Sequence, residues 1–116
     1  MRSFVVLAFA LTANGVSAQT ISQKSALDAL IGAALISEKC TLLRVNEQPY
    51  EALMTANGID TRDLSGQGRF SGYVKEARLK VLEKTEGVGV KDICALGFAL
   101  YGPKGLGTAN ILTQNQ

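Results

Sequence analysis

Two cysteines, Cys40 and Cys94, are the feature that most constrains how this chain folds, because they are the only two it contains. A disulfide between them closes a loop of about 54 residues, which the chain-entropy model values at roughly 4 kcal/mol. That is a large share of the roughly 5–10 kcal/mol expected for a domain of this size. In an oxidising compartment an even count of two indicates one disulfide, and two buried free thiols are the alternative.

The first eighteen residues indicate that the chain is exported. Arg2 supplies a short positive region, residues 4–11 (FVVLAFAL) form an unbroken apolar run, and Val16-Ser17-Ala18 places small residues where a signal peptidase cuts. The run is shorter than the about twenty apolar residues that span a bilayer. We therefore expect a cleavable signal peptide over residues 1–18, a periplasmic or secreted protein, and no stable membrane insertion after cleavage.

Residues 19–116 are expected to form a single helical domain that begins with an apolar helix over Ile21–Lys39. Few positions between Ala26 and Ile36 are polar, so we expect neighbours to cover this helix on most sides. Its apolar positions are Ala26, Leu27, Leu30, Ile31, Ala34, Leu35 and Ile36.

The second helix is predicted to be short, with Pro49 as its first residue and Gly58 as its left-handed stop. Ile59 is then free to fold back on its apolar face. The polar, glycine-bearing segment Asp60–Gly68 is predicted to be a loop.

The third helix is predicted over residues 69–85, because apolar residues recur there at spacings of three and four. These residues are Phe70, Tyr73, Val74, Ala77 and Val81. Leu79 falls opposite this stripe, so either the helix touches two neighbours or Leu79 belongs to an interface.

The fourth helix, Val90–Tyr101, is apolar nearly all round and is stopped by Gly102 and Pro103. We expect it to pack centrally against the first helix. Residues 103–116 are predicted to be a loose C-terminal tail that either lies extended over the bundle or frays. The predicted fold is all-α, a small four-helix domain with one disulfide that joins the first and last helices.

Composition argues against catalysis, because the chain has no histidine, the commonest general base and metal ligand. Asp60–Arg69 fails as a calcium loop, since its sixth position is Ser65 rather than glycine. Gly66, Gly68 and Gly72 do not fit the spacing of a dinucleotide-binding turn. We therefore expect no catalytic, metal-binding or cofactor-binding residues and no cofactor.

The charge balance argues against nucleic acid as a partner. The chain carries 12 Lys plus Arg against 10 Asp plus Glu, and removal of Arg2 with the signal leaves 11 against 10. Such a small excess of positive charge creates no electrostatic field that would attract the protein to nucleic acid or to an anionic membrane.

The third helix is nevertheless the most basic stretch of the chain. One interpretation is a solvated face. The other is a docking site for an acidic partner, with Leu79 as the apolar anchor and Arg78 and Lys75 beside it as candidate partner-binding residues. Five aromatic residues either form core or line a small pocket: Tyr50, Phe70, Tyr73, Phe98 and Tyr101.

The leading hypothesis is a non-enzymatic exported protein, most consistent with the periplasm, that acts as an interaction or accessory module for a protein or envelope partner. One alternative is a carrier that holds a small apolar ligand between its helices. Another is an acid- or envelope-stress chaperone, because the outline of an export segment, a small helical body and one long-range disulfide is similar to that of periplasmic acid-stress chaperones.

Overall fold

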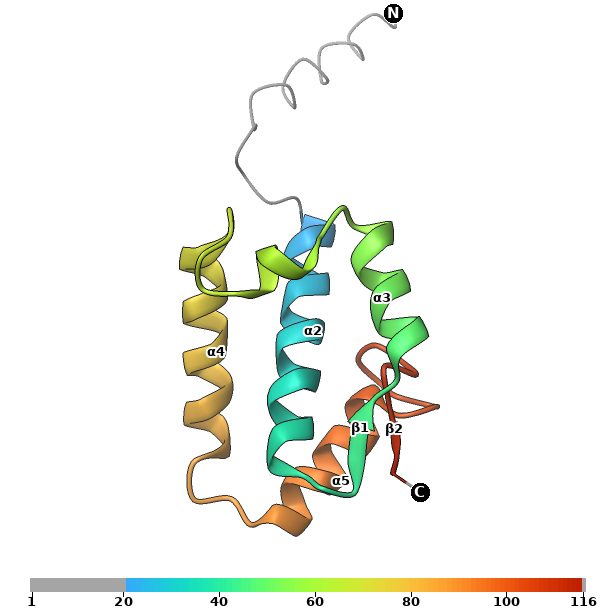
Figure 1. Ribbon diagram of the computed structural model, residues 1–116. Coiled ribbons are helices and arrows are strands. Elements are labelled where there is room, and N and C mark those ends of the chain that lie inside the picture. Colours follow the sequence, from blue (N-terminus) through green and yellow to red (C-terminus); the bar gives the residue numbers. More distant parts are fainter. Residues whose placement is uncertain (1–20, 116) are drawn as a thin grey trace, which may run out of the picture.

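The computed structural model describes residues 21–115, and the predicted signal peptide lies outside these residues. The described part of the chain folds into four α-helices, one short 3-10 helix and a two-stranded antiparallel ladder (Figure 1). In chain order the elements are α2 (Ile21–Lys39), β1 (Leu43–Val45), α3 (Glu47–Ala56), η1 (Thr61–Leu64), α4 (Ser71–Thr85), α5 (Val90–Tyr101) and β2 (Leu112–Gln114). The predicted all-α class is confirmed.

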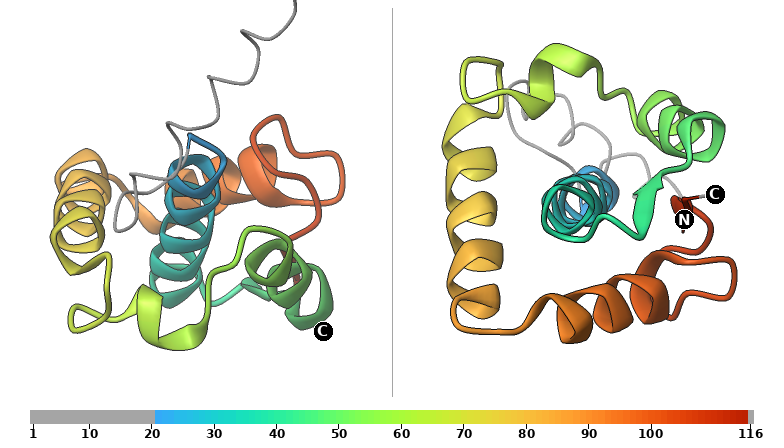
Figure 2. Two further views of the ribbon diagram at one scale, coloured as in Figure 1. Left: turned by 90° about the horizontal axis from the view of Figure 1, so that it is seen from above. Right: turned by 60° about the horizontal axis from the view of Figure 1, so that its bottom comes forward.

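Helix α2 is the centre of the fold. In Figure 2 the chain from α3 through η1, α4 and α5 forms a frame around α2, which is seen nearly end-on. All four of these elements contact α2, as does β1. Eight side chains of α2 are buried: Ala26, Leu27, Ala29, Leu30, Ile31, Ala33, Leu35 and Ile36. The prediction of a helix covered on most sides is confirmed.

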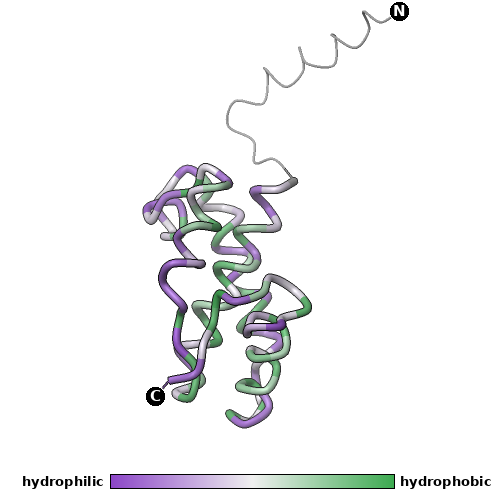
Figure 3. Tube along the Cα trace, turned by 90° about the vertical axis from the view of Figure 1, so that its right-hand side faces the viewer, coloured by the Kyte–Doolittle hydropathy of each residue, from purple (hydrophilic) through white to green (hydrophobic). Residues whose placement is uncertain are grey.

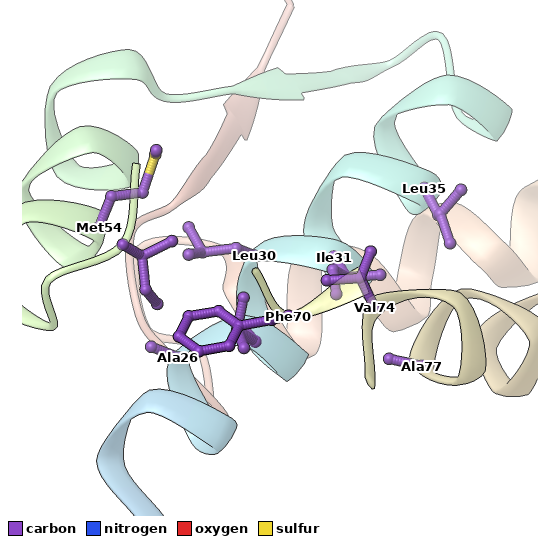
Figure 4. Close-up of a cluster of buried hydrophobic side chains, with 10 residues drawn as sticks. Ala26, Leu30, Ile31, Leu35, Met54, Phe70, Val74 and Ala77 are labelled. Carbon is purple, nitrogen blue, oxygen red and sulfur yellow. The ribbon is translucent and has the colours of Figure 1, made fainter. Parts of the chain in front are cut away.

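Two clusters of buried side chains meet on α2. One cluster joins α2 to α3 and α4, through Met54 on α3 and Phe70, Val74 and Ala77 at the start of and along α4 (Figure 4). The other joins α2 to the strands and to α5, and it contains the two cysteines. The core therefore has one half under α4 and one half under α5.

A disulfide links Cys40, directly after α2, to Cys94 in the second turn of α5, so the predicted bridge between the first and last described helices is confirmed. The two Cα atoms lie 5.3 Å apart. Gly97, one turn further along α5, allows this approach, because a Cβ there would stand only 2.5 Å from Ile36 Cγ2. A disulfide fits an oxidising compartment outside the cytosol.

Of the two alternatives for the C-terminal tail, its described part up to residue 115 lies against the bundle rather than fraying, and β2 makes it more ordered than the predicted loose tail. Ile111 and Leu112 are buried, and Leu112 pairs with Val45 in the β1–β2 ladder. Backbone bonds at both ends of the ladder hold it: Asn46 N–H donates to Ile111 O, and Asn115 N–H donates to Leu42 O. Two apolar residues followed by polar ones are too short a pattern to predict a strand. Here Ile111 and Leu112 nevertheless cover the cluster that contains the disulfide.

Helix α5 also differs from its prediction, because it packs at the side of α2 rather than in the centre. Its apolar residues continue around most of the helix (Figure 3, lower right), yet only Ile93, Cys94 and Gly97 are buried. Leu96 and Phe98 are each more than two-fifths exposed. Apolar residues all round α5 therefore did not mean that the helix was buried all round. One side of α5 is buried, and its other apolar side faces water.

Smaller differences concern α3 and the segment after it. Helix α3 begins at Glu47, so Pro49 is its third residue; proline is tolerated there because the amides of the first turn have no partner within the helix. Gly58 stops the helix with φ +65°, and Ile59 is buried, as predicted. The predicted loop Asp60–Gly68 contains η1. Helix α4 starts at Ser71 rather than residue 69.

Loss of the disulfide should remove a large part of the stability of this domain. Cys94→Ser is expected to lower the free energy of unfolding by about 4 kcal/mol, because the unfolded chain regains the entropy of the 54-residue loop. Urea unfolding followed by circular dichroism measures the change. Addition of a reductant to the unmodified protein should give a similar loss, and an unchanged midpoint in both experiments would contradict this role.

The second half of the C-terminal segment should contribute to the core, and the first half should not. Leu112→Ala is expected to cost about 2–5 kcal/mol, because Leu112 is fully buried. Leu106→Ala is the matched control, since Leu106 is 87% exposed, and should change stability by less than about 0.5 kcal/mol. Equal effects of the two substitutions in urea unfolding would show that the β1–β2 ladder does not hold the core.

Candidate functional site

The candidate partner-binding residues lie together on the outward face of α4, which we define as Lys75, Arg78, Leu79 and Leu82. These four side chains line a shallow hollow of about 320 Å³. Leu79 is 58% exposed and Leu82 is 38% exposed. The structure therefore brings the three residues singled out in the sequence to one place and adds Leu82.

The helical repeat explains why these side chains reach solvent. Val74 and Ala77 are buried against α2, so positions on the other side of α4 point away from the bundle. Of the two readings of Leu79, the exposed position excludes a second helix packed over it within residues 21–115.

The outward face of α4 is basic over its first half. Between residues 21 and 115 the only ion pair is Arg69–Asp63, so no acidic side chain of the described chain pairs with Lys75 or Arg78. Glu76 lies on another side of α4, with Tyr73 and Ala77, and Glu83 and Glu86 come at the end of the helix. An apolar hollow flanked by two cations is thus available to a partner.

The ion pair holds the start of α4 in place. Arg69 donates to both carboxylate oxygens of Asp63 through Nε and Nη2, each at 2.9 Å, and Nη2 also donates to the carbonyl of Gly58. Asp63 completes a capping box with Asp60 at the start of η1. Its side chain is only 4% exposed, and hydrogen bonding from Arg69 holds the pKa of Asp63 below its usual value. This ion pair and capping box were not predicted from the sequence, because the polar segment Asp60–Gly68 has the composition of an ordinary loop.

A second concave region lies between α2, α4 and the end of α5, and we call it the tyrosine cavity. Its volume is about 360 Å³, and it is lined by Asp28, Tyr73, Glu76, Ala77, Lys80, Val81, Lys84 and Tyr101. The Tyr73 hydroxyl donates to Asp28 Oδ1 at 2.7 Å. Burial, and then this hydrogen bond, raise the pKa of Tyr73 to about 12, so its phenol stays neutral at physiological pH.

The five aromatic residues do not form one pocket. Phe70 is core, and Tyr50 donates its hydroxyl to the carbonyl of Leu30 at 2.8 Å. Burial raises the pKa of Tyr50 to about 12. Phe98 faces water on α5, so only Tyr73 and Tyr101 meet in the tyrosine cavity.

No family model, curated protein or solved structure matches the chain. None of the helices within residues 21–115 combines the length and the apolar character needed to cross a membrane. No group of three cysteine, aspartate or glutamate side chains in this part of the chain is arranged to hold a metal ion.

Stability should depend on pH through the Asp63–Arg69 pair. Because the pKa of Asp63 is lower in the folded protein than in the unfolded chain, its contribution is fully present above about pH 3.9 and is lost as the pH falls through the folded pKa. Asp63→Asn should cost about 1–3 kcal/mol at pH 7 and remove this part of the acid sensitivity.

Urea unfolding at a series of pH values between 7 and 2 measures both effects, with Glu51→Gln as a control at an exposed carboxylate. If Asp63→Asn and the unmodified protein lose stability in parallel as the pH falls, the pair is not the source of the dependence.

Proposed function

We propose that this protein is an exported, non-enzymatic interaction module, active in the periplasm, that docks an acidic partner protein on the outward face of α4. The observation that carries the proposal is the hollow formed by Leu79 and Leu82 beside two cations with no acidic partner in the described chain. An exposed apolar patch rimmed by charge is typical of a protein-binding surface.

The chemistry of the surface specifies the partner. The hollow fits an apolar side chain, and Lys75 and Arg78 fit carboxylates placed next to it. Burial of the leucines supplies affinity, whereas the charges select the partner and its orientation. The partner is therefore a protein that presents an apolar side chain flanked by aspartate or glutamate.

The non-enzymatic and periplasmic parts of the proposal rest on separate support. Histidine is absent from the chain, and both cysteines are held in the disulfide, so the usual activated nucleophiles are missing. The apolar run before residue 19, together with the disulfide, supports export.

The test is capture from periplasmic extract with the oxidised protein immobilised, in four parallel forms. The unmodified protein and the control Leu106→Asp, which changes another exposed leucine away from α4, should retain the same protein. Leu79→Asp should retain none of it, because a carboxylate replaces the apolar anchor between the two sites for acidic groups. Lys75→Glu combined with Arg78→Glu should weaken binding at least tenfold.

Two further measurements on the captured protein, its elution by salt and its binding in purified form, complete the test. The captured protein should elute with increasing salt and should bind in purified form, since charge attraction between exposed groups is screened. Capture of no protein, or equal capture by all four forms, would contradict the proposal.

A further inference from the structure

The tyrosine cavity has a charge arrangement that the proposed docking surface does not use. It contains two carboxylates, Asp28 and Glu76, and two ammonium groups, Lys80 and Lys84. None of these forms an ion pair within the described residues, where Arg69–Asp63 is the only one. Opposite charges therefore line one cavity without neutralising each other directly.

Of the two carboxylates, Asp28 lies on α2, and Glu76 lies on α4 one turn before Lys80. Asp28 Oδ1 accepts the Tyr73 hydroxyl, and Oδ2 accepts no hydrogen bond from the described chain. Tyr101 also approaches α2, because its hydroxyl lies 2.5 Å from the position that a Cβ on Gly32 would occupy. Burial and then the charge of Asp28 raise the pKa of Tyr101.

Two neutral phenol rings beside a carboxylate with an open oxygen suit an ammonium group, which is attracted both by the charge and by aromatic faces. The positive side comes from α4, where Lys80 and Lys84 are one turn apart and follow Tyr73 on the same side of the helix. These two lysines suit a carboxylate.

The combined charges exclude simpler ligands. A plain cation would meet the two lysines, and a plain anion would meet Asp28 and Glu76. The volume of about 360 Å³ lies at the small end of the range of ligand cavities. The side chains around it are too strongly charged to favour an apolar ligand.

We propose that the tyrosine cavity binds a small zwitterion, such as a free amino acid or a betaine, with its ammonium group at Asp28 between Tyr73 and Tyr101 and its carboxylate at Lys80 and Lys84. The site is independent of the outward face of α4, since Lys80 and Lys84 lie on a different side of that helix from Leu79 and Leu82.

The experiment is a titration of the oxidised protein at constant ionic strength, followed by amide chemical shifts. The probes are glycine betaine and glycine as zwitterions, tetramethylammonium as a plain cation and acetate as a plain anion. Both zwitterions should give saturable shifts in α2, α4 and α5 around the cavity. The two singly charged probes should bind at least tenfold more weakly.

Variants separate the two sides of the cavity. Asp28→Asn, which still accepts the Tyr73 hydroxyl, should weaken glycine betaine at least tenfold. Lys80→Gln with Lys84→Gln should weaken glycine betaine but not tetramethylammonium. Asp92→Asn and Lys91→Gln on α5 each remove a charge of the same sign outside the cavity and should leave binding unchanged. Dispersed amide spectra verify that each variant is folded.

Four results would overturn the proposal: no saturation with either zwitterion, acetate as tight as glycine betaine, tetramethylammonium as tight as glycine betaine, or Asp28→Asn without effect. Vesicles of phosphatidylcholine carry the same pair of charges on a surface. The protein should stay in the supernatant with them, and co-sedimentation that Asp28→Asn abolishes would overturn the assignment to a free solute.

Discussion

Burial of α2 is the constraint on which the rest of this structure depends. A helix with eight buried side chains leaves water only when neighbours cover it on several sides, and one helix cannot do this. The chain meets the requirement by winding from α3 through η1, α4 and α5 around α2 (Figure 2). The outer helices α3, α4 and α5 each bury only a few residues. Each therefore keeps an outward face that is free to carry other chemistry, as α4 does with Leu79 and Leu82.

The disulfide reinforces the attachment of α5 to α2. Helix α5 buries only Ile93, Cys94 and Gly97, which is little apolar surface to hold twelve residues against α2. The bond from Cys94 to Cys40 fixes α5 at the end of α2, and β2 closes the same cluster with Leu112. A reducing environment would leave this half of the core with packing alone. A fold held in this way fits the oxidising compartment that residues 1–18 predict.

Periodicity predicted the parts of the fold that local sequence decides. The bounds of α2 and α5 match their predictions, because the apolar pattern of each helix and the Gly102-Pro103 stop of α5 are local features. The disulfide followed from compartment and cysteine count. Long-range contacts decided the rest. The position of α5 depended on how much of its surface α2 could cover. The burial of Ile111 and Leu112 depended on pairing of this segment with β1, which is distant in the sequence. The candidate residues Lys75, Arg78 and Leu79 were found because they share a helix face. The tyrosine cavity joins Asp28 to Tyr101, and only the tertiary fold brings these together.

Native-state hydrogen exchange of the oxidised protein tests the central position of α2 most directly. The amides from Leu27 to Leu35 should exchange only through global unfolding, with a free energy equal to that from urea, because every neighbour must leave before this helix opens. The amides of α5 should exchange through smaller openings. Exchange of α2 at a lower free energy than α4 or α5 would show that another element organises the core, and would contradict this account.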